Sequence, residues 1–399
     1  MDFGAILREL LDLLIRWTHV IAGIMWIGNS LLFNWLDRVL TKDDTRHPES
    51  FGKTWLLHSG AFYEVEKTLL PPGKLPSPLH WFMFQNLTTW VSGIALLVLV
   101  YYMGGAAYMI DPSVAAISPA TAIGIGVATL VGGWLVYDLL WRSPLGKRVP
   151  LAFAASILLL VGLSYGLSQL LSGRAAYIHI GAMLGTLMTG NVWFYVVPSQ
   201  RGLVAATQAG LPQDPALSAR AKSRSIHNNY MTFPVLFVMI SNHYPSVYGS
   251  PLGWLILSVL MLASAFVRHG MNTRFTWKQW LPWTLGSGVA GLALAGLLIA
   301  RPWQPAPVAA APVPFREVQA IMERRCVACH AAQPTDPLFS APPGGVMLTT
   351  PEQIRAYADK IFVQVVQSKA MPLANRTGMT DAERAQIAAW LAAGARIDE

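Results

Sequence analysis

The chain has 399 residues, of which 53% are hydrophobic and 13% charged, and its mean hydropathy is +0.42. An average soluble domain has about 25% charged residues, so the composition argues against a soluble globular protein and predicts that a lipid bilayer surrounds most of the chain. The net charge of +8 does not indicate nucleic-acid binding, because Lys and Arg occur in short segments between apolar stretches. The only two cysteines, Cys326 and Cys329, are too close in sequence to build a long-range disulfide framework.

Apolar stretches predict about eight membrane-spanning helices, since one span needs roughly 17 to 25 apolar residues. The stretches cover residues 10–36, 81–103, 120–141, 151–171, 177–197, 230–243, 252–267 and 281–300. The first is too long for a cleavable signal segment and is interpreted as a retained helix. The sixth is short and contains Pro234, which favours a kinked or re-entrant segment.

The basic residues of the loops predict the orientation of these spans. Loops after the first, third, fifth and seventh stretches contain many Lys and Arg residues, including Arg224 and Arg268, whereas those after the second, fourth and sixth contain only Arg174. Positively charged loops stay in the cytoplasm. With an even number of spans, both termini then lie outside the cytoplasm, so the sequence predicts a multi-pass membrane protein whose C-terminus lies on the side opposite the cytoplasm.

Composition changes after the last apolar stretch. Residues 302–314 are rich in Pro and Ala and predict a semi-rigid linker between an integral membrane domain, residues 1–301, and a small domain, residues 315–399. The small domain shows three amphipathic helix patterns, at 315–329, 350–368 and 380–393. The last opens with a capping box, in which Thr380 is the N-cap and Glu383 reaches back. The predicted fold class is therefore all-α.

The segment Cys326-Val327-Ala328-Cys329-His330 matches the c-type haem attachment motif. In this motif two thiols bond the haem vinyl groups and the adjacent histidine ligates the iron. A zinc or thiol-redox CxxC is the alternative, but zinc needs two more ligands nearby and the redox motif needs a βαβ setting. We therefore expect the small domain to be a cytochrome c domain with covalent haem c.

Met371 is the expected second axial ligand of this haem. It lies just before Pro372, in a loop between two predicted helices, where its thioether can point toward the iron. Met379 and Met347 are alternatives, because a lone methionine often only fills space in a core.

Histidines within apolar stretches are hypotheses for functional sites, because ionisable groups are expensive in a membrane. His19 and His179 form the preferred pair for the iron of a haem b in the bundle, with His243 as the third candidate. The alternative is that each is a hydrogen-bonded structural histidine.

The cytoplasmic side carries a second group of polar and aromatic residues, at 58–67, 80–81 and 225–232. Amides, imidazoles and carboxylates beside aromatic rings could bind a flat polar heterocycle. The alternative is an interfacial belt of aromatic and polar side chains, which is common in membrane proteins.

Taken together and in this order, several segments resemble the membrane-bound bacterial urate hydroxylases, which combine an N-terminal membrane domain with a C-terminal cytochrome c. The resemblance covers essentially the whole chain. It rests on Arg16-Trp17-Thr18-His19 with Gly23, Trp26, Gly28 and Asn29; Phe62 to Lys67; Leu79 to Phe82; His227 to Pro234; Ser241 to Pro245; and Cys326 to His330 with Met371-Pro372.

The resemblance implies oxidation of urate to 5-hydroxyisourate, with water as the source of the hydroxyl oxygen. Electrons would leave through haem c toward a respiratory-chain acceptor, either a cytochrome c or a terminal oxidase. We predict the substrate-side residues from their chemistry. His80 or Glu64 would act as a base at ring N–H groups, and Asn229 would be an amide partner of the carbonyl groups. His227 is a further substrate-side candidate.

The main alternative is a membrane-anchored cytochrome that only transfers electrons, from quinol or a partner subunit to a terminal oxidase. A haem-copper oxidase subunit fits poorly, because the nine histidines are scattered rather than clustered. A transporter with a regulatory cytochrome would need paired broken spans, and only the sixth stretch is of that kind.

Overall fold

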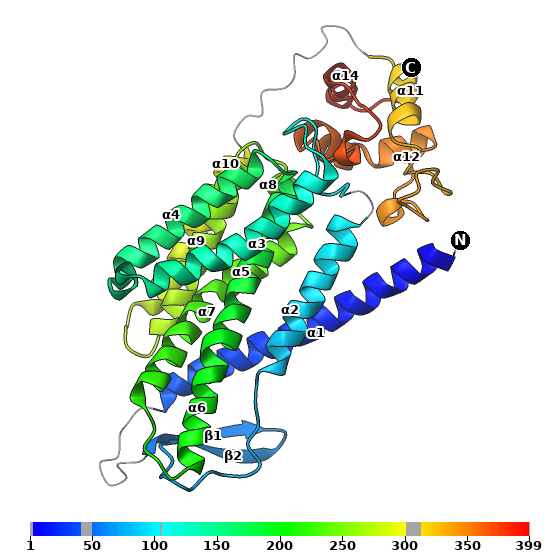
Figure 1. Ribbon diagram of the computed structural model, residues 1–399. Helices are drawn as coiled ribbons and strands as arrows, with labels where there is room; N and C mark the ends of the chain where they lie inside the picture. Colours follow the sequence, from blue (N-terminus) through cyan, green and yellow to red (C-terminus); the bar gives the residue numbers. More distant parts are fainter. Residues whose placement is uncertain (1–2, 41–49, 104–105, 301–312, 399) are drawn as a thin grey trace.

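The computed structural model describes residues 3–40, 50–103, 106–300 and 313–398. It consists of a bundle of long helices with a two-stranded hairpin at one end and a group of short helices at the other (Figure 1). The bundle helices are α1 (Phe3–Val39), α2 (Phe84–Leu96), α3 (Pro119–Arg142), α4 (Val149–Ser168), α5 (Gly173–Asn191), α6 (Val197–Gln208), α7 (Pro215–Ser241), α8 (Pro245–Tyr248), α9 (Gly253–Thr273) and α10 (Trp280–Ala300). Two π-helical segments continue α2 and α5, namely η1 (Leu97–Tyr102) and η3 (Val192–Val196), and a 3-10 turn, η2 (Pro144–Lys147), precedes α4.

Seven helices in the described part of the chain are long and apolar enough to cross a membrane. They are α1, α2 with η1, α3, α4, α5 through α6, α9 and α10, and each overlaps one of the predicted stretches along most of its length. The sixth predicted stretch, residues 230–243, overlaps the C-terminal part of α7, which is one continuous helix through Pro234 rather than a separate re-entrant segment. The N-terminal half of α7 is polar, and this half extends the helix well before the apolar stretch begins.

The hairpin corrects the all-α prediction. Strands β1 (Ser50–His58) and β2 (Ala61–Thr68) pair antiparallel, and Ser59 and Gly60 form the turn with φ of 49° and 75°. Two positive φ values at a two-residue turn match the right-handed twist of the strands. An ion pair between Lys67 and Asp37 connects the hairpin to the end of α1, so it lies against the bundle.

The core of the bundle forms around α5 and α7. Ile180, Leu184 and Val238 are almost fully buried and belong to one hydrophobic cluster with side chains of α2, α3, α4 and α9. Large apolar side chains on the outer faces of α1, α4 and α10 are exposed. A bundle with apolar residues both inside and outside is what a bilayer solvent requires.

The C-terminal helices have a hydrophobic cluster of their own. They are α11 (Phe315–Arg325), η4 (Pro343–Gly345), α12 (Pro351–Ala356), α13 (Ala358–Ile361), η5 (Phe362–Gln367), η6 (Leu373–Asn375) and α14 (Asp381–Ala392). The predicted capping box of α14 is confirmed: the Glu383 amide donates to the Thr380 hydroxyl at 3.2 Å, and the Thr380 amide donates to Glu383 Oε2 at 2.8 Å. Most of the predicted Pro/Ala linker, 302–314, lies outside the described residues, and so its form stays a prediction.

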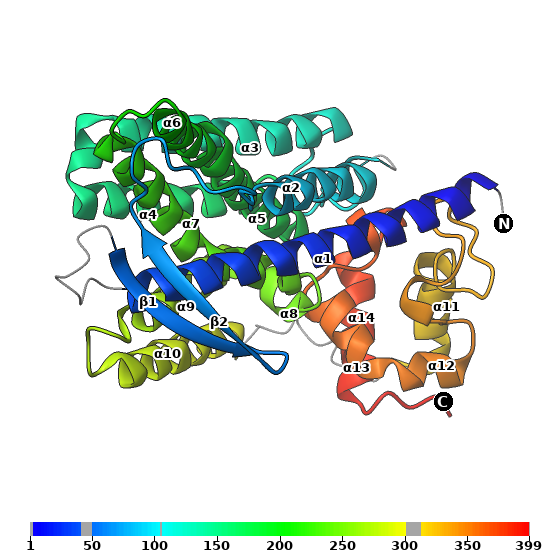
Figure 2. The same ribbon diagram turned by 90° about the horizontal axis from the view of Figure 1, so that it is seen from below.

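The C-terminal helices contact the bundle next to α8, as both ribbon views show (Figures 1 and 2). Ala370, in the loop after η5, packs against the hydrophobic core of the bundle. Gly249 follows α8 directly, and a side chain there would clash with Ser368. The loop that carries Met371 therefore begins at the surface where the two parts of the molecule meet.

Candidate functional site

The Cys326–His330 segment forms one tight turn at the end of α11. The amides of Cys329 and His330 both donate to the Cys326 carbonyl, at 3.1 and 2.9 Å. Both thiols are free, and Cys326 is buried whereas Cys329 is half-buried. Burial raises the pKa of the Cys326 thiol to about 12, so this thiol is neutral and does not act as a free thiolate nucleophile.

The imidazole of His330 is held from one side. Its Nδ1 lies 2.9 Å from the Val346 carbonyl oxygen, which is a donor contact when Nδ1 carries the proton. Nε2 is then the nitrogen left for a metal, and an outer hydrogen bond of this kind is what orients histidine ligands. The segment thus offers two thiols and one oriented imidazole on a single turn, which is the donor set of a c-type haem.

Met371 is fixed through its backbone. Its amide donates to the Gln364 carbonyl at 2.9 Å, and its carbonyl accepts from Arg384 Nη1 at 2.7 Å. The same guanidinium nitrogen also donates to the Val365 carbonyl. The half-buried Met371 side chain packs against the cluster that contains Cys326, whereas Met379 is 3% exposed within that cluster, as a space-filling residue would be.

The three histidines predicted for haem b lie in different surroundings. His19 Nδ1, on α1, contacts the Thr89 carbonyl at 2.9 Å, whereas His179 Nε2, on α5, lies 3.2 Å from the Tyr102 hydroxyl. Thr89 and Tyr102 belong to one continuous helix and are separated along it by about 20 Å. His243 is exposed at the end of α7. The preferred pair does not converge on one iron position, so we derive no step through haem b, whose presence stays a prediction.

Three consecutive residues of α7 point to three different helices. His227 Nδ1 lies 2.6 Å from the Tyr137 hydroxyl of α3, and its ring lies 4.1 Å from that of Trp141. The Asn228 side chain accepts from Asn191 Nδ2 of α5 at 2.9 Å. Asn229 faces α9. Successive residues of a helix are about 100° apart around its axis, so these three side chains face different neighbours. Their polar contacts make α7 the polar centre of the bundle.

The first of two buried arginine clusters lies between α3, α5 and α7. Arg224 Nη2 forms an ion pair with Asp138 at 3.2 Å, and Arg224 Nη1 donates to Asn191 Oδ1 at 3.3 Å. Tyr195 also donates to the Asp138 carboxylate, and its ring lies 4.0 Å below the guanidinium. We call Arg224, Asp138, Asn191 and Tyr195 the Arg224 cluster; its buried charge has an acidic partner.

The second cluster lies between α1, α7 and α9. Arg268 Nε donates to Asn229 Oδ1 at 3.0 Å, and Arg268 Nη2 lies 3.4 Å from Asn34 Oδ1. Asn272 Nδ2 donates to the same Asn229 oxygen at 2.7 Å. We call Asn34, Asn229, Arg268 and Asn272 the Arg268 cluster. Within the described residues, no carboxylate forms an ion pair with this arginine.

The four predicted substrate-side residues do not form one site. Glu64 is exposed on β2, 3.5 Å from Lys53 Nζ, and such an exposed pair has little effect on stability. His80 is exposed, and its ring centre lies 4.6 Å from that of Phe82 in an edge-to-face arrangement. His227 contacts Tyr137, whose hydroxyl accepts from Asn191 of the Arg224 cluster, and Asn229 belongs to the Arg268 cluster. The last two lie on the same helix but face different neighbours.

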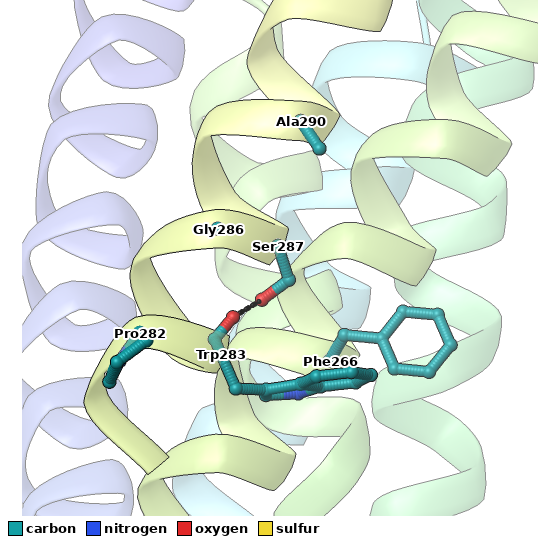
Figure 3. Close-up of a pocket in the computed structure, with 6 residues that line it drawn as sticks. All are labelled: Phe266, Pro282, Trp283, Gly286, Ser287 and Ala290. Carbon is teal, nitrogen blue, oxygen red and sulfur yellow. Dashed lines mark hydrogen bonds between the residues drawn. The ribbon is translucent and has the colours of Figure 1, made fainter. Parts of the chain in front are cut away.

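A hollow of about 360 Å³ lies between α9 and α10 (Figure 3). It is lined by Phe266, Pro282, Trp283, Gly286, Ser287 and Ala290. The Ser287 hydroxyl donates to the Trp283 carbonyl at 2.8 Å, so its proton is already used. The lining suits an apolar group, such as a hydrocarbon chain, and lacks what a polar heterocycle needs.

Sequence reasoning missed the two central arginines as site residues. We counted Arg224 and Arg268 among the loop cations, but the structure places them inside α7 and α9, where they are 6% and 4% exposed. A signal was present in the sequence, because Arg268 and Asn272 are four residues apart and therefore share one helix face.

The fold and these sites define a membrane-embedded helical bundle with a separate C-terminal helical domain at one end. Residues 5–300 match the family model described as "Urate oxidase N-terminal". This match covers most of the chain and almost all of the bundle, so the chain belongs to this urate oxidase-related family. It therefore belongs among the oxidoreductases of purine catabolism. No curated protein and no solved structure matches the chain.

Proposed function

We propose that the chain is a membrane-bound urate hydroxylase that passes electrons to a c-type haem in its own C-terminal domain. The reaction is urate plus water to 5-hydroxyisourate, two electrons and two protons, with the new C–O bond formed from water. The observation that carries the substrate assignment is the family match over residues 5–300. The CxxCH turn lies outside that match, in the attached domain.

The donor set of the C-terminal domain supports covalent haem c. Cys326 and Cys329 would form the thioether bonds, with His330 and Met371 as the two axial ligands. When bound, the haem supplies a one-electron acceptor for the electrons of urate. The chain's own residues orient the ligands: Val346 holds the outer nitrogen of His330, and Arg384 holds the backbone of Met371.

The contact between the two domains supports electron transfer within one chain. The loop from Ser368 to Met371 packs beside α8, so the expected ligand loop faces the end of the bundle. Burial lowers the pKa of Arg384, while Asp111 in the loop between η1 and α3 raises it. Asp111 therefore lies close enough to Arg384 for a favourable charge interaction across the domain contact.

The proposed location is a bacterial inner membrane with the cytochrome domain in the periplasm. The hairpin and the C-terminal helices lie at opposite ends of the bundle (Figure 1), and the basic loops predict that the hairpin end is cytoplasmic. Haem c is attached outside the cytoplasm, which agrees with this orientation. A soluble cytochrome c or a terminal oxidase would then accept the electrons.

His227 and Asn229 are the proposed substrate-side residues that the bundle buries or half-buries. The Tyr137 hydroxyl beside His227 Nδ1 orients the ring, and Nε2 is left to take a proton from the substrate or from water. Glu64 and His80 stay candidates at the same end of the molecule. If His227→Ala and Glu64→Gln each left the turnover of urate unchanged, their assignment would be wrong.

The direct test adds urate to anaerobic membranes that contain the full chain and follows the c-type absorption band. We expect urate to reduce the haem and 5-hydroxyisourate to appear. The mass of the intact chain should include a covalently attached porphyrin. A Cys326→Ala, Cys329→Ala variant is the control, and it should lose both the covalent mass and the urate-dependent change.

Two outcomes would count against the proposal. Reduction of the haem by quinol but not by urate would favour the alternative of a pure electron-transfer module. If the chain carries no covalently attached porphyrin, the proposed electron acceptor is absent and the proposal fails. For the axial ligand, Met371→Ala should lose the methionine-to-iron charge-transfer band and lower the potential, and a variant that keeps both would exclude Met371.

A further inference from the structure

We infer that the Arg268 cluster binds the substrate as an anion, specifically a flat heterocycle that carries ring N–H groups. The inference rests on the proposed function for the identity of that heterocycle, urate. It adds a binding site with Arg268 as the charged anchor and Asn272 and Asn34 as further contacts. These three residues, unlike Asn229, were not among the predicted site residues.

The charge of Arg268 is the first argument. Its guanidinium cannot lose its proton in a protein, and the residue is 4% exposed. Its hydrogen-bond partners in the described chain are two neutral amides, Asn229 and Asn34. A buried charge without a counterion is costly, so an anion placed here gains a favourable interaction that the described residues do not supply.

The orphaned oxygen of Asn272 is the second argument. Asn272 is 5% exposed, and its Oδ1 has no hydrogen-bond partner in the described part of the molecule, although its Nδ2 is used. A buried acceptor without a donor loses its hydration without compensation. The ligand that completes the cluster must therefore donate an N–H or O–H group as well as carry negative charge.

These two requirements together select the ligand class. A phosphate ester or a carboxylate offers negative oxygens to Arg268 but no hydrogen for Asn272 Oδ1. The urate monoanion offers both, because carbonyl oxygens and ring N–H groups alternate around its edge. The Phe233 ring lies 5.5 Å from the Arg268 guanidinium and provides a flat apolar surface beside the site. A lipid phosphate is thus disfavoured.

The test measures urate binding separately from turnover. The full-length, haem-loaded protein is reduced with dithionite, so that it cannot accept electrons, and binding of radiolabelled urate is measured by equilibrium dialysis. We expect Arg268→Gln to weaken binding about 10- to 100-fold, as loss of a charged hydrogen-bond donor does. Arg268→Lys keeps the positive charge but loses the planar guanidinium. Its urate affinity should lie between those of the unmodified protein and Arg268→Gln.

Arg274→Gln is the matched control, because Arg274 follows the same helix but contacts the Phe275 ring instead of the cluster. Its urate affinity should equal that of the unmodified protein. Thermal unfolding without urate shows whether each variant is folded. Equal urate affinity in Arg268→Gln and the unmodified protein, or equal losses in Arg268→Gln and Arg274→Gln, would overturn the inference.

Two further results separate this inference from the proposed function. If urate binds in an Arg268-dependent way but does not reduce the haem, the binding site stands and the function fails. If urate reduces the haem with an unchanged KM in Arg268→Gln, the function stands and the site fails. Acetate, an anion without an N–H or O–H donor, is the second probe, and displacement of urate by acetate at equal concentration would overturn the heterocycle assignment.

Discussion

Two buried arginines lie in separate clusters around α7, Arg224 on α7 itself and Arg268 on α9, and their surroundings differ in one respect. Arg224 has the Asp138 carboxylate, an amide and a tyrosine ring around it. Arg268 has amides and a phenylalanine ring but no acidic partner within the described residues. The first set of contacts includes a counterion from the described residues, and the second, in the inference above, takes its counterion from a bound anion.

The difference teaches how to distinguish a structural cluster from a binding site. A buried ion pair with its hydrogen bonds satisfied holds helices in a fixed arrangement, and breaking it leaves one charge uncompensated. A cluster with an unpaired cation and an orphaned acceptor is less stable without its ligand. The two arginines should therefore respond in opposite ways to substitution, and four experiments examine this contrast.

The largest effect is expected from Asp138→Asn. This change leaves the guanidinium of Arg224 buried without a counterion, so the free energy of unfolding should fall by about 3 to 5 kcal/mol. Chemical unfolding of the detergent-solubilised protein measures it. The double variant with Arg224→Gln should recover part of the loss, and a single variant as stable as the unmodified protein would show that the pair is not structural.

Asn272→Asp tests the other arginine by giving it the carboxylate that it lacks. Since Asn272 shares the Asn229 oxygen with Arg268, the new carboxylate would lie beside the guanidinium and compete with the substrate anion. Urate affinity should fall about 10- to 100-fold. The ligand-free protein should be at least as stable as before.

Thermal unfolding and urate binding on the same Asn272→Asp sample check both parts of this prediction. Asn242→Asp, at the other end of α7, provides a control for an added charge in an amide position. Unchanged urate affinity in Asn272→Asp would contradict the idea that the cluster is open to an anion.

A smaller effect is expected from Tyr137→Phe. The Tyr137 hydroxyl contacts His227 Nδ1 and accepts from Asn191 Nδ2 at 2.9 Å. Removing it leaves two polar groups with fewer partners, and stability should fall by about 2 kcal/mol. Urate affinity should not change, because this hydroxyl touches no residue of the Arg268 cluster, whereas urate turnover should fall, because the hydroxyl orients the His227 ring. A weakened affinity would indicate that the two clusters act as one site.

The smallest effect is expected for an arginine pair outside the membrane. Arg325 Nε donates to Glu383 at 3.0 Å, and the Glu383 side chain is 11% exposed. Burial opposes ionisation, but the Thr380 amide and Arg325 outweigh it and lower the pKa of this carboxyl. Glu383→Gln keeps the cap and removes the charge, at a cost of about 1 kcal/mol at neutral pH.

The pH dependence of this pair has a definite sign. A lowered pKa stabilises the folded state at pH values above the ordinary pKa, and the contribution is lost as the pH falls through the lowered value. The Glu383→Gln variant should therefore approach the unmodified protein in stability in acid. Urea unfolding followed by circular dichroism in the Soret region measures the stability of both proteins at neutral and at acid pH. An equal difference at neutral and acid pH would exclude the ion pair as the cause.

Local patterns in the sequence predicted much of the fold. Seven of the predicted apolar stretches correspond to seven helices of spanning character, and the capping box of α14 follows from Thr380 and Glu383. These features depend on residues close in sequence, so hydropathy and spacing are sufficient to find them. The cytochrome motif is also local, although its haem stays a prediction.

Features that depend on distant residues were not predictable in the same way. The hairpin was not predicted: residues 58–67 were interpreted either as part of a heterocycle site or as an interfacial belt. In the structure, strand β2 is mostly exposed and buries little apolar surface. Asn229 was chosen for its chemistry, but its partner Arg268 lies on another helix, and one sequence gives no register between α7 and α9. His19 and His179 were paired because both lie within predicted apolar stretches, but their neighbours in the bundle differ.

The end-to-end layout of the bundle has an energetic consequence. Arg268 lies about 20 Å along α9 from its first residue, Gly253, and the C-terminal segment η5 contacts α8, which precedes α9 in the chain. In the proposed orientation, each electron taken from urate moves from the negative to the positive side of an energised membrane. A potential of 100 mV would favour the transfer of each charge across its full width by about 2.3 kcal/mol. Collapsing the potential with an ionophore should then slow urate oxidation in intact vesicles.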